Sequence, residues 1–111
     1  MNHVVCRYRK SEWRPFYNMA DTTIIRQRII FKGRVQGVGF RYRARYAADG
    51  MGLTGWVQNE WDGSVIMEVQ GRLDTINEML RLLNHSSFIE IDDVDRMNIP
   101  VEEYESGFHV H

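Results

Sequence analysis

The residues with the clearest chemical potential lie between Gly33 and Arg41. Three glycines occur within seven residues: Gly33, Gly37 and Gly39. A glycine-rich turn lets the backbone curl until several N–H groups point to one side, and such a turn attracts anions. Arg41 follows two residues later, and a guanidinium matches the oxygens of a phosphate group. The segment therefore predicts an anion site made of main-chain N–H groups and one arginine.

The elements on either side of this segment strengthen the prediction. A β-branched run over residues 24–31 predicts a strand before it, and apolar residues at helical spacing over 40–51 predict a helix after it. A helix start adds free N–H groups and a positive dipole end. Because a cation in a first turn is mildly unfavourable, Arg41 at that place indicates an anion beside it. A tight glycine turn followed by a solvated arginine remains the alternative, since the run matches neither common nucleotide-binding motif.

The charge is distributed very unevenly along the 111 residues. The net charge is −1, but residues 26–49 carry seven basic residues and one acidic residue, whereas residues 60–111 carry three basic and twelve acidic ones. A basic segment within a nearly neutral chain favours a local anion site. A protein that coats nucleic acid is more often basic overall, so RNA binding ranks last among the functions considered.

The periodicity of the remaining chain predicts an α+β fold. Asp62-Gly63 is a hairpin turn between two strand-like runs, Asp74 is placed to cap a second amphipathic helix, and Gly52 is suited to end the first. The expected strands and helices occupy residues 24–31, 40–51, 53–60, 64–70, 74–84, 91–99 and 108–110. This order predicts a ferredoxin-like βαββαβ sandwich, an antiparallel sheet with two helices on one face.

Residues 1–22 show no strand or helix period, so we expect an N-terminal extension outside the core, followed by one domain over residues 23–111. Two alternatives stay open for the extension. In the first, the chain starts at Met19 and the extension is not part of the fold. In the second, the extension is an arm that packs through Trp13 and Phe16.

The cysteine content and the hydropathy limit which bonds, metal sites and membrane segments we expect. Cys6 is the single cysteine, so neither an internal disulfide nor a cysteine-based metal site is expected. Asp92, Asp93 and Asp95 lack the other ligands of a calcium loop. The N-terminus has no apolar stretch typical of a signal peptide, and no apolar run is long enough for a membrane span. These features favour a cytoplasmic protein without a metal site or a membrane partner.

Two motifs resemble those of the acylphosphatase family. The run Gly33-Arg34-Val35-Gln36-Gly37-Val38-Gly39-Phe40-Arg41 resembles the signature loop of that family. The run Leu53-Thr54-Gly55-Trp56-Val57-Gln58-Asn59, followed by Asp62-Gly63-Ser64-Val65, resembles its second signature. The likeness covers about residues 26–110, and the extension has no counterpart in the family.

The resemblance implies hydrolysis of an acyl phosphate to a carboxylate and inorganic phosphate. It implies that the loop N–H groups and Arg41 hold the phosphate, that Asn59 positions the attacking water, and that neither metal nor cofactor takes part. The implied phosphate-binding residues are Gln36, Gly37, Val38, Gly39, Phe40 and Arg41. Without the resemblance, Asn59 is simply a polar residue that ends a strand before a hairpin.

The expected partners are a small acyl phosphate as substrate and phosphate or sulfate as a product-like ligand, bound by a monomer. The alternative function is a non-catalytic anion-binding or regulatory module of the same fold. The identity of the acyl group is not encoded in any recognisable motif.

Overall fold

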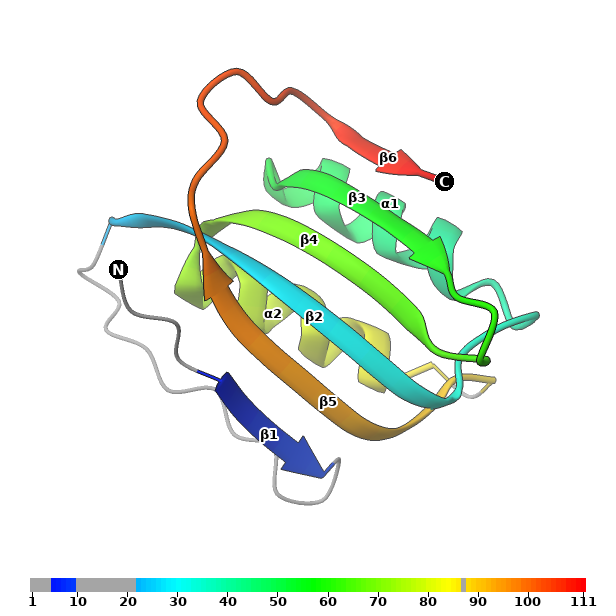
Figure 1. The fold of residues 1–111 in the computed structure, drawn as a ribbon. Coiled ribbons are helices and arrows are strands. Elements are labelled where there is room, and N and C mark those ends of the chain that lie inside the picture. The colour runs from blue at the N-terminus through cyan, green and yellow to red at the C-terminus, as the bar shows by residue number, and fades with distance from the viewer. Residues whose placement is uncertain (1–4, 10–21, 87) are drawn as a thin grey trace.

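The computed structural model describes residues 5–9, 22–86 and 88–111 (Figure 1). Its elements are β1 (Val5–Arg9), β2 (Ile24–Arg34), α1 (Phe40–Met51), β3 (Thr54–Asn59), β4 (Val65–Arg72), α2 (Leu73–Asn84), β5 (Glu90–Ile99) and β6 (Phe108–Val110). From β2 to β5 this is the predicted βαββαβ order, and β6 has the predicted bounds.

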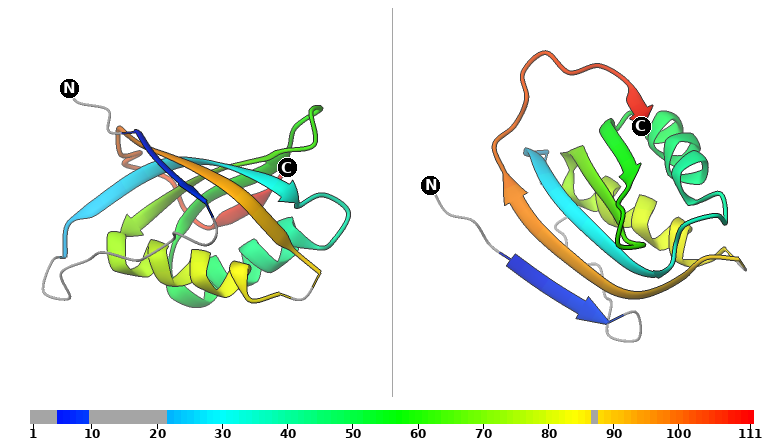
Figure 2. Two further views of the ribbon diagram at one scale, coloured as in Figure 1. Left: turned by 90° about the horizontal axis from the view of Figure 1, so that it is seen from below. Right: turned by 45° about the vertical axis from the view of Figure 1, so that its right-hand side comes forward.

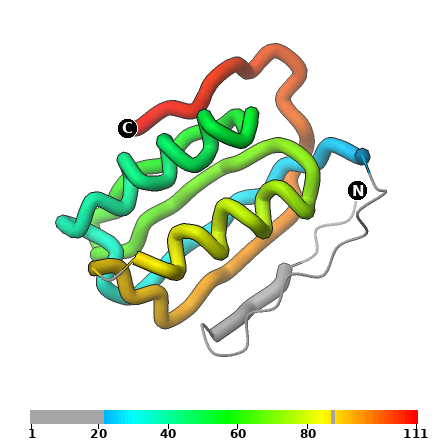
Figure 3. Tube along the Cα trace, turned by 180° about the vertical axis from the view of Figure 1, so that it is seen from behind, coloured from blue at the N-terminus to red at the C-terminus, as the bar shows by residue number. Residues whose placement is uncertain are grey.

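The described strands form one six-stranded sheet in the order β1-β5-β2-β4-β3-β6. Both helices cover the same face of this sheet, which is clearest when the molecule is seen from below or from behind (Figures 2 and 3). The predicted arrangement of two helices on one face is confirmed.

The sheet is mixed, which corrects the expectation of a purely antiparallel sheet. β6 runs parallel to β3, with Gly55 opposite Phe108 and Val57 opposite Val110. The last residues of β5 lie at the same end of the sheet as the first residues of β3 (Figure 1). The connection after β5 stays at this end of the sheet, so β6 begins where β3 begins and runs in the same direction as β3.

β1 is a second departure, because residues 1–22 show no strand period. It pairs antiparallel with β5, with Val5 opposite Met97 and Arg9 opposite Asp93. An edge strand can form through main-chain hydrogen bonds alone, so no alternation of apolar side chains is needed to produce it. The alternatives concerning Met19, Trp13 and Phe16 fall on residues outside the described ones.

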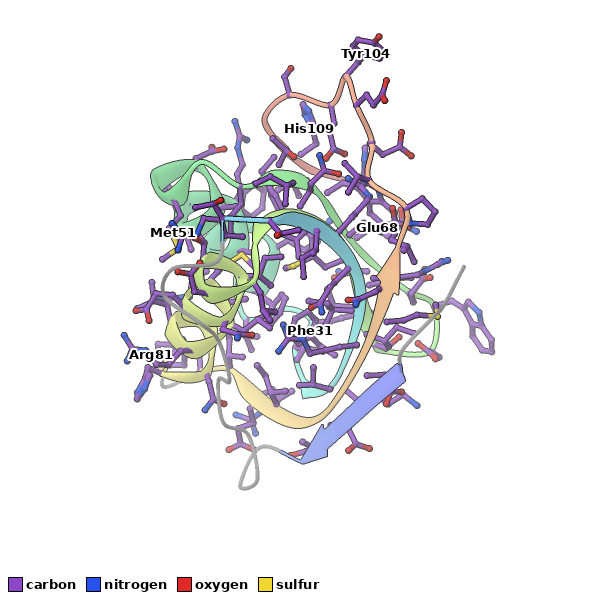
Figure 4. All side chains as sticks on the ribbon, turned by 90° about the vertical axis from the view of Figure 1, so that its left-hand side faces the viewer. Phe31, Met51, Glu68, Arg81, Tyr104 and His109 are labelled. Carbon is purple, nitrogen blue, oxygen red and sulfur yellow. The ribbon has the colours of Figure 1, made fainter. Side chains whose placement is uncertain are left out.

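The hydrophobic core fills the space between the sheet and the helices, where Phe31 lies (Figure 4). Residues that alternate along β2 and β4 point inward, as period-two strands require. The predicted apolar stripe of α1 is confirmed, since it contributes buried residues and two partly buried ones. The buried residues on the elements nearest the predicted site are Ile29, Phe31, Val35, Phe40, Ala44, Ala48, Val57, Val65, Met67 and Phe108.

Two local boundaries differ from the expected ones, and a third agrees. β2 continues to Arg34, with an irregular register between Lys32 and Gly33, so only residues 35–39 form the curled loop. α2 is capped by Arg72, and Asp74 instead lies in its first turn. Gly52 adopts the left-handed conformation that ends α1, as predicted.

Candidate active site

The loop between β2 and α1 contains two glycines in the left-handed conformation. Gly37 has φ 73° and Gly39 has φ 78°, and no residue other than glycine has a positive φ among the described residues. Val38, between them, therefore has a negative φ. An alternation of left- and right-handed residues directs successive N–H groups to one side. Gly37 and Gly39 thus adopt the left-handed conformations that the predicted curl requires.

The main-chain N–H groups of this loop are available to a ligand. Within the described part of the chain, no carbonyl or side chain accepts a hydrogen bond from the N–H groups of residues 36–40. The first helical bond is donated by Arg43 to the Gly39 carbonyl, at 3.0 Å. Gly39 caps α1, and the first turn holds no acidic residue. An anion here would meet both free donors and the positive end of the helix dipole.

Apolar side chains fix both ends of the loop to the core. Val35 and Phe40 are buried, and the Phe40 ring lies 4.8 Å from that of Phe31. Val38 is half-buried and packs against the same core. The side chains of Val38 and Phe40 therefore face the protein interior, which leaves only their N–H groups for a ligand.

Arg41 is half-buried in the first turn of α1, and its guanidinium is held by His111, the residue after β6. Its Nη1 donates to the main-chain oxygen of His111 at 2.7 Å. His111 is itself held by the Val57 carbonyl, which accepts its N–H at 2.9 Å, and by Trp56, whose ring lies 5.8 Å from the imidazole. A guanidinium has five N–H donors, so this contact orients Arg41 without using most of them.

Asn59 is the last residue of β3. Its Oδ1 is buried and accepts no hydrogen bond from any described residue. A buried polar atom without a partner costs about 1–3 kcal/mol, so such an atom marks a place where a ligand or water is expected.

The pairing of β3 with β6 brings these residues to one end of the sheet. Val57 lies opposite Val110 in parallel register, so the position of His111 follows β3 toward Asn59. Arg41, held at the His111 oxygen, is thereby directed to the end of β3. The loop N–H groups belong to the chain segment that leads directly into Arg41. The three predicted components therefore come from neighbouring segments.

The Gln36 side chain makes a contact that the sequence did not predict. Its Nε2 donates to the Glu60 carbonyl at 2.6 Å and to the Ser64 carbonyl at 2.8 Å. Gln36 was expected to act through its main-chain N–H alone. A loop glutamine has many possible partners in sequence, and only the placement of the β3–β4 hairpin beside the loop selects these two.

The hairpin turn after Asn59 is closed by hydrogen bonds to the Asp62 side chain. Asp62 Oδ1 accepts hydrogen bonds from the Ser64 hydroxyl at 2.6 Å and the Ser64 N–H at 2.9 Å. These bonds, with a smaller effect from Lys32, hold the pKa of Asp62 below its ordinary value. Lys32 and Asp62 line a shallow depression together with Gly33, Gly63 and Ser64. The predicted Asp62-Gly63 turn is confirmed. Because its pKa is lowered, the Asp62 carboxylate is ionised at neutral pH.

Among the described residues, no group of three or more His, Cys, Asp or Glu side chains is arranged to hold a metal ion. Neither described helix combines the length and the apolar character that a membrane span requires.

Comparison with known proteins agrees with this geometry. The family model described as Acylphosphatase matches residues 27–110. An acylphosphatase of Clostridium perfringens (strain SM101 / Type A) is 36% identical over 89 residues, which cover 79% of this chain and 100% of that protein. The crystal structure of acylphosphatase from Bacillus subtilis matches with a TM-score of 0.72 and 33% identity, over 78% of this chain and 98% of its own.

The structure of an acylphosphatase from Coxiella burnetii matches with a TM-score of 0.73 and 31% identity, over 84% of this chain and 100% of its own. The family-model match over residues 27–110 includes the loop, the hairpin and β6, which are the segments that build the candidate site. The chain therefore belongs to the acylphosphatase family.

Proposed function

We propose that this chain hydrolyses acyl phosphates at the site formed by residues 36–40, Arg41 and Asn59. The loop N–H groups and Arg41 hold the phosphate, and Asn59 positions the attacking water. Membership of the acylphosphatase family supports the reaction class. The loop itself supports the assignment of the site. Gly37 and Gly39 have positive φ, and the N–H groups of residues 36–40, directly before Arg41, donate to no described residue.

The chemistry suits a site without a strong acid. The water oxygen forms a bond to phosphorus while the bond from phosphorus to the acyl oxygen breaks. The products are a carboxylate and inorganic phosphate. Because a carboxylate is a good leaving group, it needs no protonation as it departs. The transition state is loose and places charge on the phosphoryl oxygens, where fixed donors stabilise it.

Each group has a defined task in this proposal. Arg41 neutralises the phosphoryl charge and is oriented by its hydrogen bond to the His111 oxygen. The buried Oδ1 of Asn59 accepts a hydrogen bond from the water and holds it in line with the breaking bond. An amide is too weak a base to remove the proton, so a phosphoryl oxygen of the substrate accepts it.

The proposal is tested with benzoyl phosphate as substrate. The wild-type chain should hydrolyse it without added metal and with no loss of rate in a chelator. Arg41→Ala and Asn59→Ala should each lower kcat/KM on the order of 10²–10³-fold, the usual effect of removing one such donor. Circular dichroism of both variants is the control that checks whether they remain folded.

The two variants should also differ from each other. R41A should weaken binding of inorganic phosphate, whereas N59A should retain it, because Arg41 contacts the phosphoryl group in the proposed site and Asn59 contacts the water. Wild-type rates in both variants would show that the site is assigned to the wrong residues. An inert wild-type chain that still binds phosphate would instead identify a binding module.

A further inference from the structure

We infer that Gln36 is a positioning residue whose side chain aligns Asn59 with the phosphate loop. This inference rests on the proposed function and adds a role that belongs to the carboxamide alone. The main-chain N–H of the same residue belongs to the proposed phosphate site, so the two roles are separable by substitution.

The carboxamide of Gln36 bridges the loop and the hairpin with both of its hydrogens. Nε2 carries two hydrogens, and the acceptors are the carbonyls of Glu60 and Ser64, at 2.6 and 2.8 Å. We call this pair of contacts the Gln36 bridge. No hydrogen of the amide nitrogen is left over, so the orientation of the side chain is fixed.

The two carbonyls are the ones that close the hairpin. Ser64 O also accepts the Glu60 N–H at 2.9 Å, and Glu60 O also accepts the Gly63 N–H at 3.2 Å. Each carbonyl has two lone pairs, so both acceptors are fully used. The base of the hairpin therefore cannot move relative to the loop without breaking hydrogen bonds at both points.

The bridge is close to Asn59 along both strands. Glu60 is the next residue after Asn59, and Ser64 precedes Val65, which pairs with Asn59 in the β3–β4 ladder. Gln36 thus holds both strands one residue from the Asn59–Val65 pair, on the side of the turn. Displacement of a reacting group by about 1 Å can lower a rate about 100-fold, so a water held by Asn59 depends on this alignment.

Gln36→Met removes both donors while keeping the length of the side chain and the main-chain N–H. We expect kcat for benzoyl phosphate to fall about 10- to 100-fold. The inhibition constant of inorganic phosphate should stay near the wild-type value, because the loop donors are unchanged. A wild-type kcat in Q36M would overturn the inference, as would a loss confined to phosphate affinity.

Gln58→Met is the matched control. Gln58 also carries a carboxamide near the hairpin, but its Nε2 donates to the Glu60 carboxylate at 3.3 Å and does not reach the loop. Q58M should retain the wild-type kcat and KM. If Q36M does not fold, Gln36→Asn serves instead, since its shorter side chain cannot span both carbonyls.

A double-mutant cycle tests whether Gln36 acts through Asn59. If it does, adding Q36M to N59A should lower kcat far less than adding it to the wild-type chain. Equal factors in the two backgrounds would show that Gln36 affects the reaction independently of Asn59, and the inference would fail.

A readout without catalysis separates this inference from the proposed function. In the wild-type chain, adding inorganic phosphate should shift the amide NMR signals of residues 37–40 and also those of residues 60–64. In Q36M the loop signals should still shift and the hairpin signals should not. Equal hairpin shifts in both proteins would contradict the bridge, whereas an inert wild-type enzyme would contradict the proposed reaction alone.

Discussion

Three glycines of this chain would respond differently to an added methyl group. Gly55 has φ 142°, and a Cβ there would lie 1.9 Å from the Glu68 carbonyl oxygen. Gly39 has φ 78° but open space around the added atom. Gly50, in the last turn of α1, has an ordinary φ and open space. The three positions therefore separate steric clash, backbone strain and helix propensity.

We expect the free energy of unfolding to follow this order. Gly55→Ala should be the most destabilising, by more than about 2 kcal/mol, because strand β4 would have to move. Gly39→Ala should cost about 1–2 kcal/mol, the strain of a left-handed residue with a Cβ. Gly50→Ala should stabilise the protein by about 0.5–1 kcal/mol. Urea denaturation of the three variants measures these differences.

Activity provides a second comparison for the same variants. G39A should also weaken phosphate binding, because its left-handed turn sets the direction of the loop N–H groups. G50A should keep the wild-type kcat/KM, since Gly50 has no role in the loop. A G39A enzyme that binds phosphate normally would contradict the proposed loop geometry.

Among single residues, the sequence proposes which groups take part in the chemistry but does not predict their contacts. Arg41 was predicted from its place after three glycines, and Asn59 from the family resemblance. The contact between Arg41 and His111 was not predicted, and neither was the Gln36 bridge. Both contacts depend on which strands become neighbours in the sheet, and nothing in the local pattern of residues 36–41 specifies this.

Among the elements, the connection between β5 and β6 (residues 100–107) is attached by charged groups. Arg26, only 2% exposed, donates to both carboxylate oxygens of Glu105, at 2.6 and 3.0 Å. It also donates to Glu68 at 3.1 Å. The buried guanidinium thus joins β2, β4 and the connection on the sheet face opposite the helices.

Hydrogen bonds to main-chain groups, two of them made by the Gln70 side chain, hold the rest of the connection. Gln70 donates to the Glu102 carbonyl at 2.9 Å and accepts the Glu102 N–H at 2.8 Å. Gly55 donates to the Gly107 carbonyl at 3.1 Å. Tyr104, by contrast, lies at the exposed tip of the connection (Figure 4). These contacts fix where β6 begins and therefore the position of the His111 oxygen to which Arg41 donates.

The Glu105 contact makes stability dependent on pH. Burial raises the pKa of Glu105, but hydrogen bonds from Arg26 and Thr54 and the charge of Arg26 together outweigh burial and lower it. A lowered pKa means that the ionised group stabilises the fold above the pKa of an unfolded glutamate, about 4.3. This contribution is lost as the pH falls from about 5 through the lowered pKa.

Glu105→Gln should therefore lower the free energy of unfolding by about 1–2 kcal/mol at pH 7, a reduced value because Glu105 is partly exposed. The deficit should shrink as the pH falls below 4.3, where the wild-type carboxylate is also becoming protonated. Denaturation at several pH values measures both. Glu102→Gln is the control, because Glu102 contacts Gln70 only through its main chain. A deficit in E105Q that is independent of pH would contradict the ion pair.

Secondary structure was the more predictable part at this scale. The periodicities located both helices and the strands from β2 to β6 within a few residues. The parallel direction of β6 was missed because pairing direction follows from where β5 ends. β1 was missed because an edge strand needs no alternation of apolar residues. The N-cap of α2 was missed because Arg72 makes no capping hydrogen bond with its side chain.

In the molecule as a whole, the proposed site lies within residues 36–111, whereas β1 lies on the far side of β5 (Figure 1). We expect a chain without residues 1–18 to hydrolyse benzoyl phosphate at a rate near that of the full chain. The same deletion removes β1 and leaves the edge of β5 open to pairing with another chain. Turnover and light scattering at increasing protein concentration measure the two effects.

A large loss of turnover in the shortened chain would contradict the predicted boundary at residue 22. Unchanged light scattering would show that β1 does not protect the edge of β5. The full-length chain at the same concentrations is the reference for both measurements.

The hydrogen bond between Arg41 and His111 joins positions 70 residues apart. Segments so distant meet late in folding, because the intervening chain must first be ordered. During synthesis, the glycine loop and the start of α1 leave the ribosome well before β6. A nascent chain can therefore form the proposed phosphate loop while Arg41 still lacks its hydrogen bond to His111, and we expect full activity only after β6 has paired with β3.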